Sequence, residues 1–255
     1  VDRALSSLPS PIIANSDAIR ARFHRGGRPM AKAVTIINGV DAERFHPGLS
    51  GNSVRERYGI APGCVIAGVV GRISPVKGQR AFLEAAAALL PRLPDLRFLI
   101  VGSGLFPGEK EHEAALRAFA EENDMAGRVI FTGYQTDVRP FMAALDICVV
   151  PSLEEGCGRA IFEAMALEKP VVGTDSGGTP EIVAEGETGA LVPPRDPRAL
   201  AEAIERLAKD ESLRREWGRA GRRRVEAHLT LERNARRTEA AYLRLLGEEE
   251  GAGDG

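Results

Sequence analysis

The chain has 255 residues, 44% of them hydrophobic and 27% charged, proportions that are ordinary for a soluble globular protein. Its 34 basic and 36 acidic residues leave a formal net charge of −2, which argues against nucleic acid as the main partner. No apolar run approaches the roughly 20 residues that a membrane-spanning helix requires. The cysteines show neither metal-site nor disulfide spacing and fit a reducing cytosol; they are Cys64, Cys148 and Cys157.

The first segment reads as a strand–helix–strand unit followed by a connector. Short apolar runs at 11–14 and 34–37 flank Asn15-Ser16-Asp17, which offers N-cap chemistry for a helix. Asn38-Gly39-Val40-Asp41 then predicts a turn. We expect a domain boundary shortly after it, near 46–52.

From residue 65 onward, short apolar strands alternate with helical segments. The strands are continuously apolar, which is typical of a parallel sheet covered on both faces. Because crossovers between parallel strands are right-handed, this order predicts an α/β fold with a doubly wound, Rossmann-like parallel sheet. The predicted strand and helix of each pair are 65–70 with 79–90, 97–101 with 111–122, 129–132 with 137–144, 147–150 with 159–167, 170–173 with 180–184, and 190–192 with 197–209.

Two charged helices and an acidic tail follow the sheet. We expect helices over 213–228 and 231–246, and a disordered tail at 248–255, which cannot bury anything. The last helix has an apolar stripe that should be buried. Its residues are Leu231, Ala235, Thr238, Tyr242 and Leu245.

The loop after the first strand of the sheet carries two cations. Ligands of doubly wound sheets collect outside the carboxyl ends of the strands. There Gly71 lets the backbone approach a ligand, and Arg72 and Lys77 could clamp a diphosphate beside a helix N-terminus. The alternative is that both cations are solvated loop charges. The loop is not a P-loop, because Gly78 and Gln79 follow Lys77.

The loops after the second and third strands give weaker signals. Gly102 and Gly104 resemble the opening of a dinucleotide fingerprint whose third glycine is missing, so a simple turn is the alternative. Tyr134 follows the third strand, where the backbone could face a flat base.

The loop after the fourth strand is the strongest candidate. Gly156, Cys157 and Gly158 expose consecutive N–H groups at a helix start, which predicts an anion cradle. Glu155 precedes the cradle and Glu163 follows it, and both could accept hydrogen bonds from sugar hydroxyls. The alternative has Glu163 as a favourable charge near a helix N-terminus and Glu155 as loop surface.

A further glycine pair, Gly177-Gly178, follows the fifth strand just before Pro180. Glycine-bearing loops thus meet at one edge of the predicted sheet, which favours a shared ligand site.

In this order, the motifs resemble the retaining glycosyltransferases of the large GT-B-fold group (family 4 type) that includes sucrose and glycogen synthases. The family signature of Glu, seven residues and Glu reads here as Glu155 to Glu163. The resemblance covers about residues 11–228 and rests on the ordered set of motifs. Its other marks are Asn38-Gly39-Val40-Asp41, Gly71-Arg72, Lys77-Gly78, Val101-Gly102-Ser103-Gly104, Pro151-Ser152, Pro170-Val171-Val172 and Gly177-Gly178-Thr179-Pro180-Glu181.

The resemblance implies a role for each site residue. Arg72 and Lys77 would hold the donor diphosphate and stabilise its charge as it leaves, and Glu163 would bind the ribose. Glu155 and the backbone of 156–158 would hold the donor sugar and its phosphate. The predicted set is Arg72, Lys77 and Glu155 for catalysis, and Gly71, Gly102, Gly104, Tyr134, Gly156, Cys157, Gly158 and Glu163 for donor binding, with no metal ligand. Cys157 departs from the bulky residue usual at its position, which leaves the donor sugar undetermined.

Partners and domains also follow from the resemblance. We expect a UDP- or GDP-sugar as donor, no required cofactor, and a saccharide or lipid-linked acceptor. The expected location is the cytoplasm, with peripheral contact at the inner membrane face. None of the four histidines lies in the context of an acceptor-site histidine, so we expect a missing N-terminal domain to carry much of the acceptor site. The implied parts are 1–45, a remnant of that domain with its linker; 46–228, the nucleotide-sugar domain; 229–247, a helix crossing back; and 248–255, the tail.

Three other functions fit parts of the pattern. A nucleotide-sugar-binding module without catalysis would share the same loops. A nucleotide-sugar epimerase would share the two-domain architecture but need acid–base carboxylates and a histidine in its cleft. A nicotinamide-dependent enzyme is disfavoured, since no strand is followed by a complete fingerprint.

Overall fold

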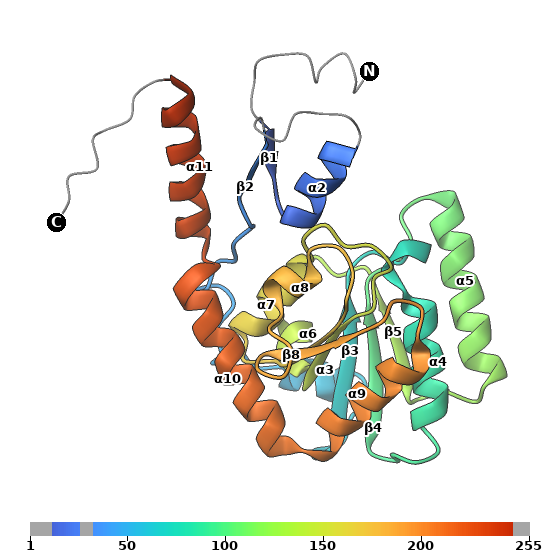
Figure 1. Ribbon diagram of the computed structural model, residues 1–255. Coiled ribbons are helices and arrows are strands. Elements are labelled where there is room, and N and C mark those ends of the chain that lie inside the picture. The colour runs from blue at the N-terminus through green and yellow to red at the C-terminus, as the bar shows by residue number, and fades with distance from the viewer. Residues whose placement is uncertain (1–11, 26–32, 247–255) are drawn as a thin grey trace.

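The computed structural model describes residues 12–25 and 33–246, and the predicted tail lies outside them. Strand β1 (Ile12–Ala14) leads into helix α2 (Asp17–Arg25), and β2 (Ala33–Thr35) pairs with β1 in parallel. Ser16 Oγ accepts a hydrogen bond from the Ile19 N–H at 3.2 Å, the N-cap bond that the sequence predicts. This small unit stands above one end of the larger sheet (Figure 1).

The main body is a six-stranded, fully parallel sheet with the spatial order β5-β4-β3-β6-β7-β8. The chain builds outward from β3 to one edge and then from β6 to the other. This is the doubly wound, Rossmann-like arrangement predicted from the sequence. The strands are β3 (Val65–Val70), β4 (Leu96–Val101), β5 (Val129–Gly133), β6 (Ile147–Val150), β7 (Val171–Thr174) and β8 (Gly189–Val192).

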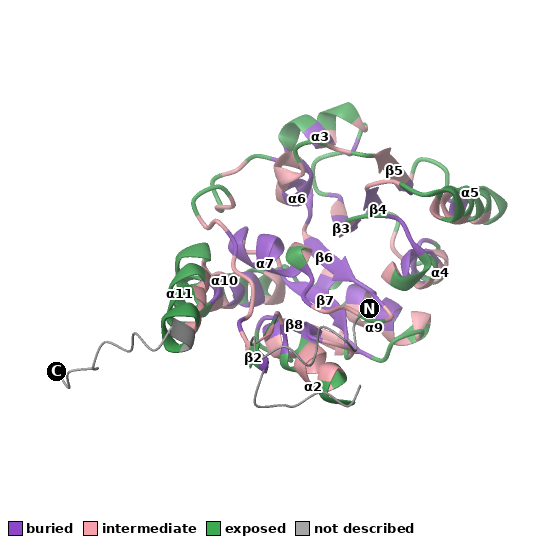
Figure 2. Ribbon diagram, turned by 90° about the horizontal axis from the view of Figure 1, so that it is seen from above, coloured by how far each residue is buried: buried purple, intermediate pink, exposed green. Residues whose placement is uncertain are grey.

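Helices cover both faces of this sheet (Figure 2). One face carries α3 (Asn52–Arg57), α6 (Arg139–Ala144), α7 (Arg159–Ala166) and α10 (Glu211–His228). The other carries α4 (Gln79–Leu89), α5 (Pro107–Glu122) and α9 (Pro197–Lys209). A single turn of helix, α8 (Thr179–Ile182), follows β7.

Successive residues of the strands enter different cores. In β3, Ile66 belongs to the core beneath α7, whereas Ala67 and Val69 belong to the core beneath α4 and α9. The same alternation runs along β6, where Cys148 joins the first core and Val149 the second. Because side chains of a strand point alternately to the two faces, both faces must be apolar, which explains the continuously apolar strands.

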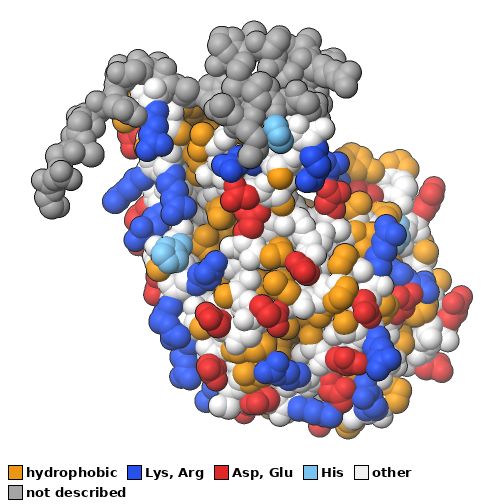
Figure 3. Space-filling model, in the orientation of Figure 1, with side chains coloured by type: hydrophobic (Ala, Val, Ile, Leu, Met, Phe, Trp, Pro, Cys, Tyr) orange, Lys and Arg blue, Asp and Glu red, His pale blue; other side chains and the backbone are white. Residues whose placement is uncertain are grey.

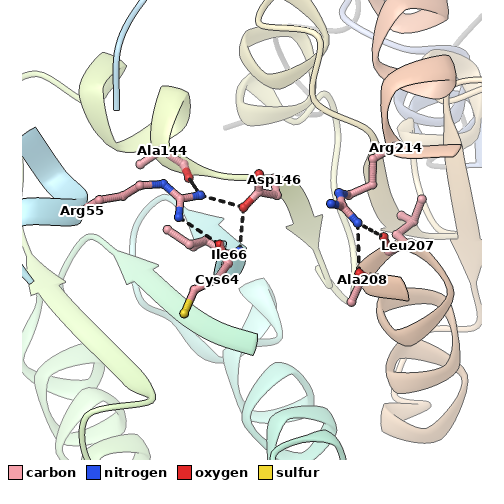
Figure 4. A network of polar contacts seen from close by, with 8 residues as sticks. All are labelled: Arg55, Cys64, Ile66, Ala144, Asp146, Leu207, Ala208 and Arg214. Carbon is pink, nitrogen blue, oxygen red and sulfur yellow. Dashed lines mark hydrogen bonds and ion pairs between the residues drawn. The ribbon is translucent and has the colours of Figure 1, made fainter. Parts of the chain in front are cut away.

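A polar network fastens the amino ends of the two central strands (Figure 4). Asp146, just before β6, accepts hydrogen bonds from the Ile66 N–H and from the Arg55 guanidinium, each at 2.8 Å. Arg55 also donates to the carbonyl oxygens of Cys64 and Ala144. The network ties α3 and β6 to β3 at the end of the sheet opposite the small β1–β2 unit.

Helix α11 (Leu231–Leu246) continues from α10 and stands apart from the sheet (Figure 1). Residues 211–246 contain ten arginines and five glutamates, and basic side chains gather along this edge of the molecule (Figure 3). The described residues leave the apolar stripe of α11 largely exposed. Leu231 is 50% and Tyr242 is 56% exposed, because this face points away from both cores.

Most predicted elements agree with the structure to within a few residues, with two differences near the sheet. The short helix α3 was not expected, since its sequence is polar and buries only Val54. Helix α5 begins at Pro107 instead of 111, because Glu109 caps it by accepting from the Phe106 N–H.

Candidate functional site

A pocket of about 240 Å³ opens where β3 and β6, the two central strands, end side by side. The connections that follow these strands run to opposite faces, so the loops diverge and leave room between them. The N-termini of α4 and α7 both open onto the pocket, and helix N-termini favour anions. The lining residues are Val69, Val70, Gly71, Arg72, Lys77, Gln79, Val149, Val150, Pro151, Ser152, Glu155, Gly158, Arg159 and Ala160.

Lys77 is held by a tight turn against the β6 loop. Gly78 has a φ of 70°, and a Cβ there would lie 1.9 Å from the Pro151 carbonyl oxygen, so only glycine allows this approach. The Leu153 N–H also donates to the Val76 carbonyl oxygen at 2.8 Å. The two loops therefore pack together, and Lys77 Nζ lies 2.5 Å from Glu155 Oε2.

Arg72 lines the same pocket, and its guanidinium is paired with a residue of α5. Its Nη1 lies 3.0 Å from Glu109 Oε1, and the guanidinium sits 5.8 Å from the centroid of the Phe106 ring. The other oxygen of Glu109 accepts hydrogen bonds from the Leu105 and Phe106 N–H groups at the start of α5. Glu109 was not among the residues predicted from the sequence, where its only signal is its place three residues after an N-cap.

Two of the predicted donor-binding glycines lie behind the pocket and do not line it. A Cβ on Gly102 would lie 2.0 Å from the Gly71 carbonyl oxygen, and one on Gly104 would lie 2.5 Å from the backbone of Glu109. Their lack of a side chain lets the loops after β3 and β4 pack closely and brings Glu109 within reach of Arg72.

Gln79, the first residue of α4, lines the pocket and was not among the site residues predicted from the sequence. It is 1% exposed, and its Nε2 donates to the Arg72 carbonyl oxygen at 2.9 Å. Its Oε1 is buried and has no hydrogen-bond partner among the described residues. A buried polar atom of this kind is costly unless it is paired.

The three residues predicted to form an anion cradle, 156–158, lie in three different environments. Gly158 is the N-cap of α7 and lines the pocket. Gly156 faces α2, where a Cβ would lie 3.3 Å from Ile19 Cγ1. Cys157 is buried in a core, and this burial raises the pKa of its thiol to about 11, against an opposing hydrogen bond from Asn38.

Glu163 lies in an adjoining pocket of about 330 Å³, together with Asn38 and Asn234. Arg159 lines both pockets, and its Nη2 is 3.8 Å from Glu163 Oε1. Burial raises the pKa of the Glu163 carboxyl, while Arg159 acts in the opposite direction. The structure therefore brings Arg72, Lys77 and Glu155 into one pocket and sets Glu163 in the next.

Tyr134 follows β5 and is 68% exposed. It lines neither pocket. Leu105 and Phe106, in the loop after β4, are also more than half exposed.

The small β1–β2 unit is fixed over the site by a carboxylate. Glu181 accepts hydrogen bonds from the Asp17 and Ala18 N–H groups, each at 2.8 Å, and so caps α2. Gly178 lies under Ser16, because a Cβ there would be 2.8 Å from Ser16 Cβ. The first turn of α2 is thus seated on the glycine pair after β7.

Within the described residues, we find no cluster of three or more histidine, cysteine or acidic side chains placed to hold a metal ion. The helices of the described ranges include none with the length and hydrophobicity needed to cross a bilayer.

A doubly wound sheet whose switch point carries a cation-lined pocket and two helix N-termini defines a nucleotide-binding domain of the Rossmann type. Residues 52–224 match the family described as Glycosyl transferases group 1. The chain belongs to this family of glycosyltransferase enzymes.

Relatives and solved structures agree with this family. The chain is 30% identical over 238 residues to the lipopolysaccharide core biosynthesis mannosyltransferase LpsB of Rhizobium meliloti (strain 1021), covering 92% of this chain and 68% of LpsB. It is 34% identical over 210 residues to a D-inositol 3-phosphate glycosyltransferase of Corynebacterium urealyticum (strain ATCC 43042 / DSM 7109), covering 80% of this chain and 49% of that enzyme. The structure of Anabaena Alr3699/HepE in complex with UDP-glucose superimposes with a TM-score of 0.86 and 27% identity, over 95% of this chain and 65% of that one. The chain thus spans about half to two thirds of the length of the curated relatives it matches.

Proposed function

We propose that this chain supplies the donor site of a retaining glycosyltransferase that moves a sugar from a UDP- or GDP-sugar to a saccharide or lipid-linked acceptor. The observation that carries the proposal is the grouping of Arg72, Lys77 and Glu155 around one pocket at the switch point. Two cations suit a diphosphate, and a carboxylate beside them suits the hydroxyls of the attached sugar.

The chemical difficulty of the transfer is the negative charge that develops on the leaving diphosphate. In the proposed site, Lys77, Arg72 and the N-termini of α4 and α7 stabilise that charge in a fixed arrangement. Glu155 holds the sugar, while Glu163 binds the ribose from the adjoining pocket. The acceptor attacks on the face of the leaving group, so this chain contributes positioning and charge and no nucleophile of its own.

Three similar proteins support the donor class. HepE is known in complex with UDP and with UDP-glucose. LpsB, and LpcC of Rhizobium leguminosarum bv. viciae, are named mannosyltransferases. We infer from these names a nucleoside-diphosphate hexose as donor for this chain. Tyr134, exposed at the end of β5, is placed to contact the base if the nucleotide extends from the pocket toward that edge.

The acceptor side belongs in this proposal to an N-terminal domain. Residues 1–45 would be its remnant and linker, and α11 would cross back to it with the exposed stripe that includes Leu231 and Tyr242. On this proposal the 255-residue chain binds donor but transfers sugar poorly, and full transferase activity of this chain alone would refute the division of labour.

The epimerase alternative gains no support from the pocket. An epimerase needs acid–base carboxylates and a histidine in its cleft. Carboxylates are present, but no histidine is among the residues that line either pocket in the described part of the chain. Without an acceptor domain, this chain would bind a nucleotide sugar without catalysing its transfer.

We place the enzyme in the cytoplasm, with peripheral contact at the inner membrane face where lipid-linked acceptors lie. The three cysteines are free and buried, as expected in a reducing compartment.

A thermal-shift screen of UDP-, GDP- and ADP-sugars tests the donor site directly. A ligand that binds only the folded form adds about 2.7 kcal/mol of stability at 100 times its Kd. A true donor therefore raises the melting temperature, and the rise follows the logarithm of its concentration. Unchanged melting temperatures with all three donors at millimolar concentration would refute the proposed donor site.

A further inference from the structure

Each cation that lines the switch-point pocket is paired with a carboxylate of the chain itself. Lys77 lies 2.5 Å from Glu155, Arg72 lies 3.0 Å from Glu109, and Arg159 lies 3.8 Å from Glu163. The three carboxylates are well covered, with side-chain exposures of 12%, 14% and 12%. A diphosphate binds cations through the same kind of anionic oxygen. It therefore competes with a carboxylate for Lys77 and for Arg72.

The backbone of Glu155 is fixed, so this residue stays in place when Lys77 turns away from it toward a phosphate. Its carbonyl oxygen accepts a hydrogen bond from the Gly178 N–H at 2.7 Å, and Gly177 packs against its backbone. Its Oε2 also accepts from Ser152 Oγ at 3.0 Å, and Ser152 is itself buried. When Lys77 turns to a phosphate, the Glu155 carboxylate stays in the pocket, and Ser152 Oγ is its remaining hydrogen-bond donor among the described residues.

Glu109, unlike Glu155, keeps backbone hydrogen-bond donors when its cation leaves. Its Oε2 accepts from the Leu105 and Phe106 N–H groups at the start of α5. These bonds persist when Arg72 turns to a phosphate, and the helix N-terminus favours the charge. Release of Arg72 therefore leaves Glu109 satisfied, whereas release of Lys77 leaves Glu155 in need of donors.

We propose that Glu155 is a displaceable counter-ion that makes the pocket prefer a nucleotide carrying a sugar over the bare nucleoside diphosphate. This rests on the donor site proposed above. A covered carboxylate left without donors destabilises the complex. Sugar hydroxyls supply those donors, and a bare diphosphate has none to offer. After transfer, the return of Lys77 to Glu155 favours release of the diphosphate product. Ser152 is a positioning residue that keeps the carboxylate in place for both partners.

Calorimetric titration of the 255-residue chain with UDP, UDP-glucose, GDP and GDP-mannose tests this proposal. In Glu155→Gln, Lys77 no longer has an ionic partner to give up, so the bare diphosphate of the preferred base binds about 3–10-fold more tightly than to the parent. The ratio of the Kd of the bare diphosphate to that of its sugar form falls by a similar factor. Glu109→Gln is the matched control, since glutamine also supports the helix cap. It tightens both ligands alike and leaves the ratio unchanged.

The outcomes separate this proposal from the donor site itself. If the parent chain binds none of the four ligands, the donor site and this proposal fail together. If the parent binds a sugar nucleotide but Glu155→Gln weakens the bare diphosphate, or both variants change the ratio equally, the donor site stands and the counter-ion role is overturned. Thermal unfolding of each variant in the absence of nucleotide confirms that the compared chains are folded.

Discussion

Gly177 packs so closely on Glu155 that a Cβ added to it would lie 2.0 Å from the Glu155 carbonyl oxygen. Its φ of 60° is also in the left-handed region that favours glycine. The position of the Glu155 loop therefore depends on a residue of the next loop along the sheet.

Substitution Gly177→Ala should displace the Glu155 loop and weaken sugar-nucleotide binding at least ~10-fold, because misplacement of about 1 Å is costly in a preorganised site. Gly186→Ala is the matched control. Gly186 has a φ of 74° and open space around its missing Cβ, so it carries only the backbone cost of about 1 kcal/mol. Equal nucleotide affinity in the two variants would show that the contact with Glu155 does not matter.

Substitution Lys77→Ala should weaken binding of the preferred sugar nucleotide by ~10- to 100-fold, as expected when a charged hydrogen-bond partner is removed. Lys110→Ala is the control, since Lys110 is an exposed lysine of α5 that does not line the pocket. Both variants should keep the helical circular dichroism of the parent. Calorimetry that gives the same affinity for Lys77→Ala and the parent would refute the diphosphate role.

Substitution Glu163→Gln should stabilise the chain near neutral pH while weakening nucleotide binding. Burial raises the pKa of Glu163 above the ordinary 4.5, so the ionised form is disfavoured in the folded state. Its contribution to stability is present below the ordinary value and is lost as pH rises through the raised pKa. The stability gap between variant and parent, measured by thermal unfolding, should therefore open as pH rises from about 4. A gap that is the same at pH 3.5 and 7 would mean that its cause is not titration of this carboxyl.

Substitution Asp146→Ala should lower the free energy of unfolding by about 2–3 kcal/mol, because it leaves the Ile66 N–H and the Arg55 guanidinium without their shared partner. Glu202→Ala removes an ion pair to Arg198 whose side chains are 89% and 64% exposed, and it should change stability by less than about 0.5 kcal/mol. Urea denaturation checks both values. Similar losses in the two variants would contradict a special role for the network.

The sheet and the placement of its loops could be predicted from the sequence, because strands that are buried on both faces must be continuously apolar. The position of Lys77 beside Glu155 could be anticipated on the same basis, since their strands were expected to end at one edge. Other features depend on contacts that no local pattern encodes. Glu109 reaches Arg72 only because Gly102 and Gly104 allow two loops to pack closely. The stripe of α11 obeys helical spacing, yet spacing does not say what covers it.

The placement of Glu155 and Glu163 in different pockets is another feature that the sequence pattern did not predict. Their spacing suggests two carboxylates around one anion cradle. However, α7 begins between them, after its N-cap Gly158, and places Glu163 in the adjoining pocket. Because the start of a helix changes the direction of the chain, the number of residues between two side chains does not determine whether they reach the same pocket.

The alternation of β3 residues between two cores has a consequence for how this protein can diverge. Inserting or deleting one residue within such a strand would exchange the surroundings of Ile66 and Ala67 and disrupt both layers of helices at once. The loops at the carboxyl ends have no such alternation, so away from close-packed glycines such as Gly177 they can change without exchanging the two cores. Preference for one sugar or another can therefore drift in evolution while the framework that presents it stays fixed.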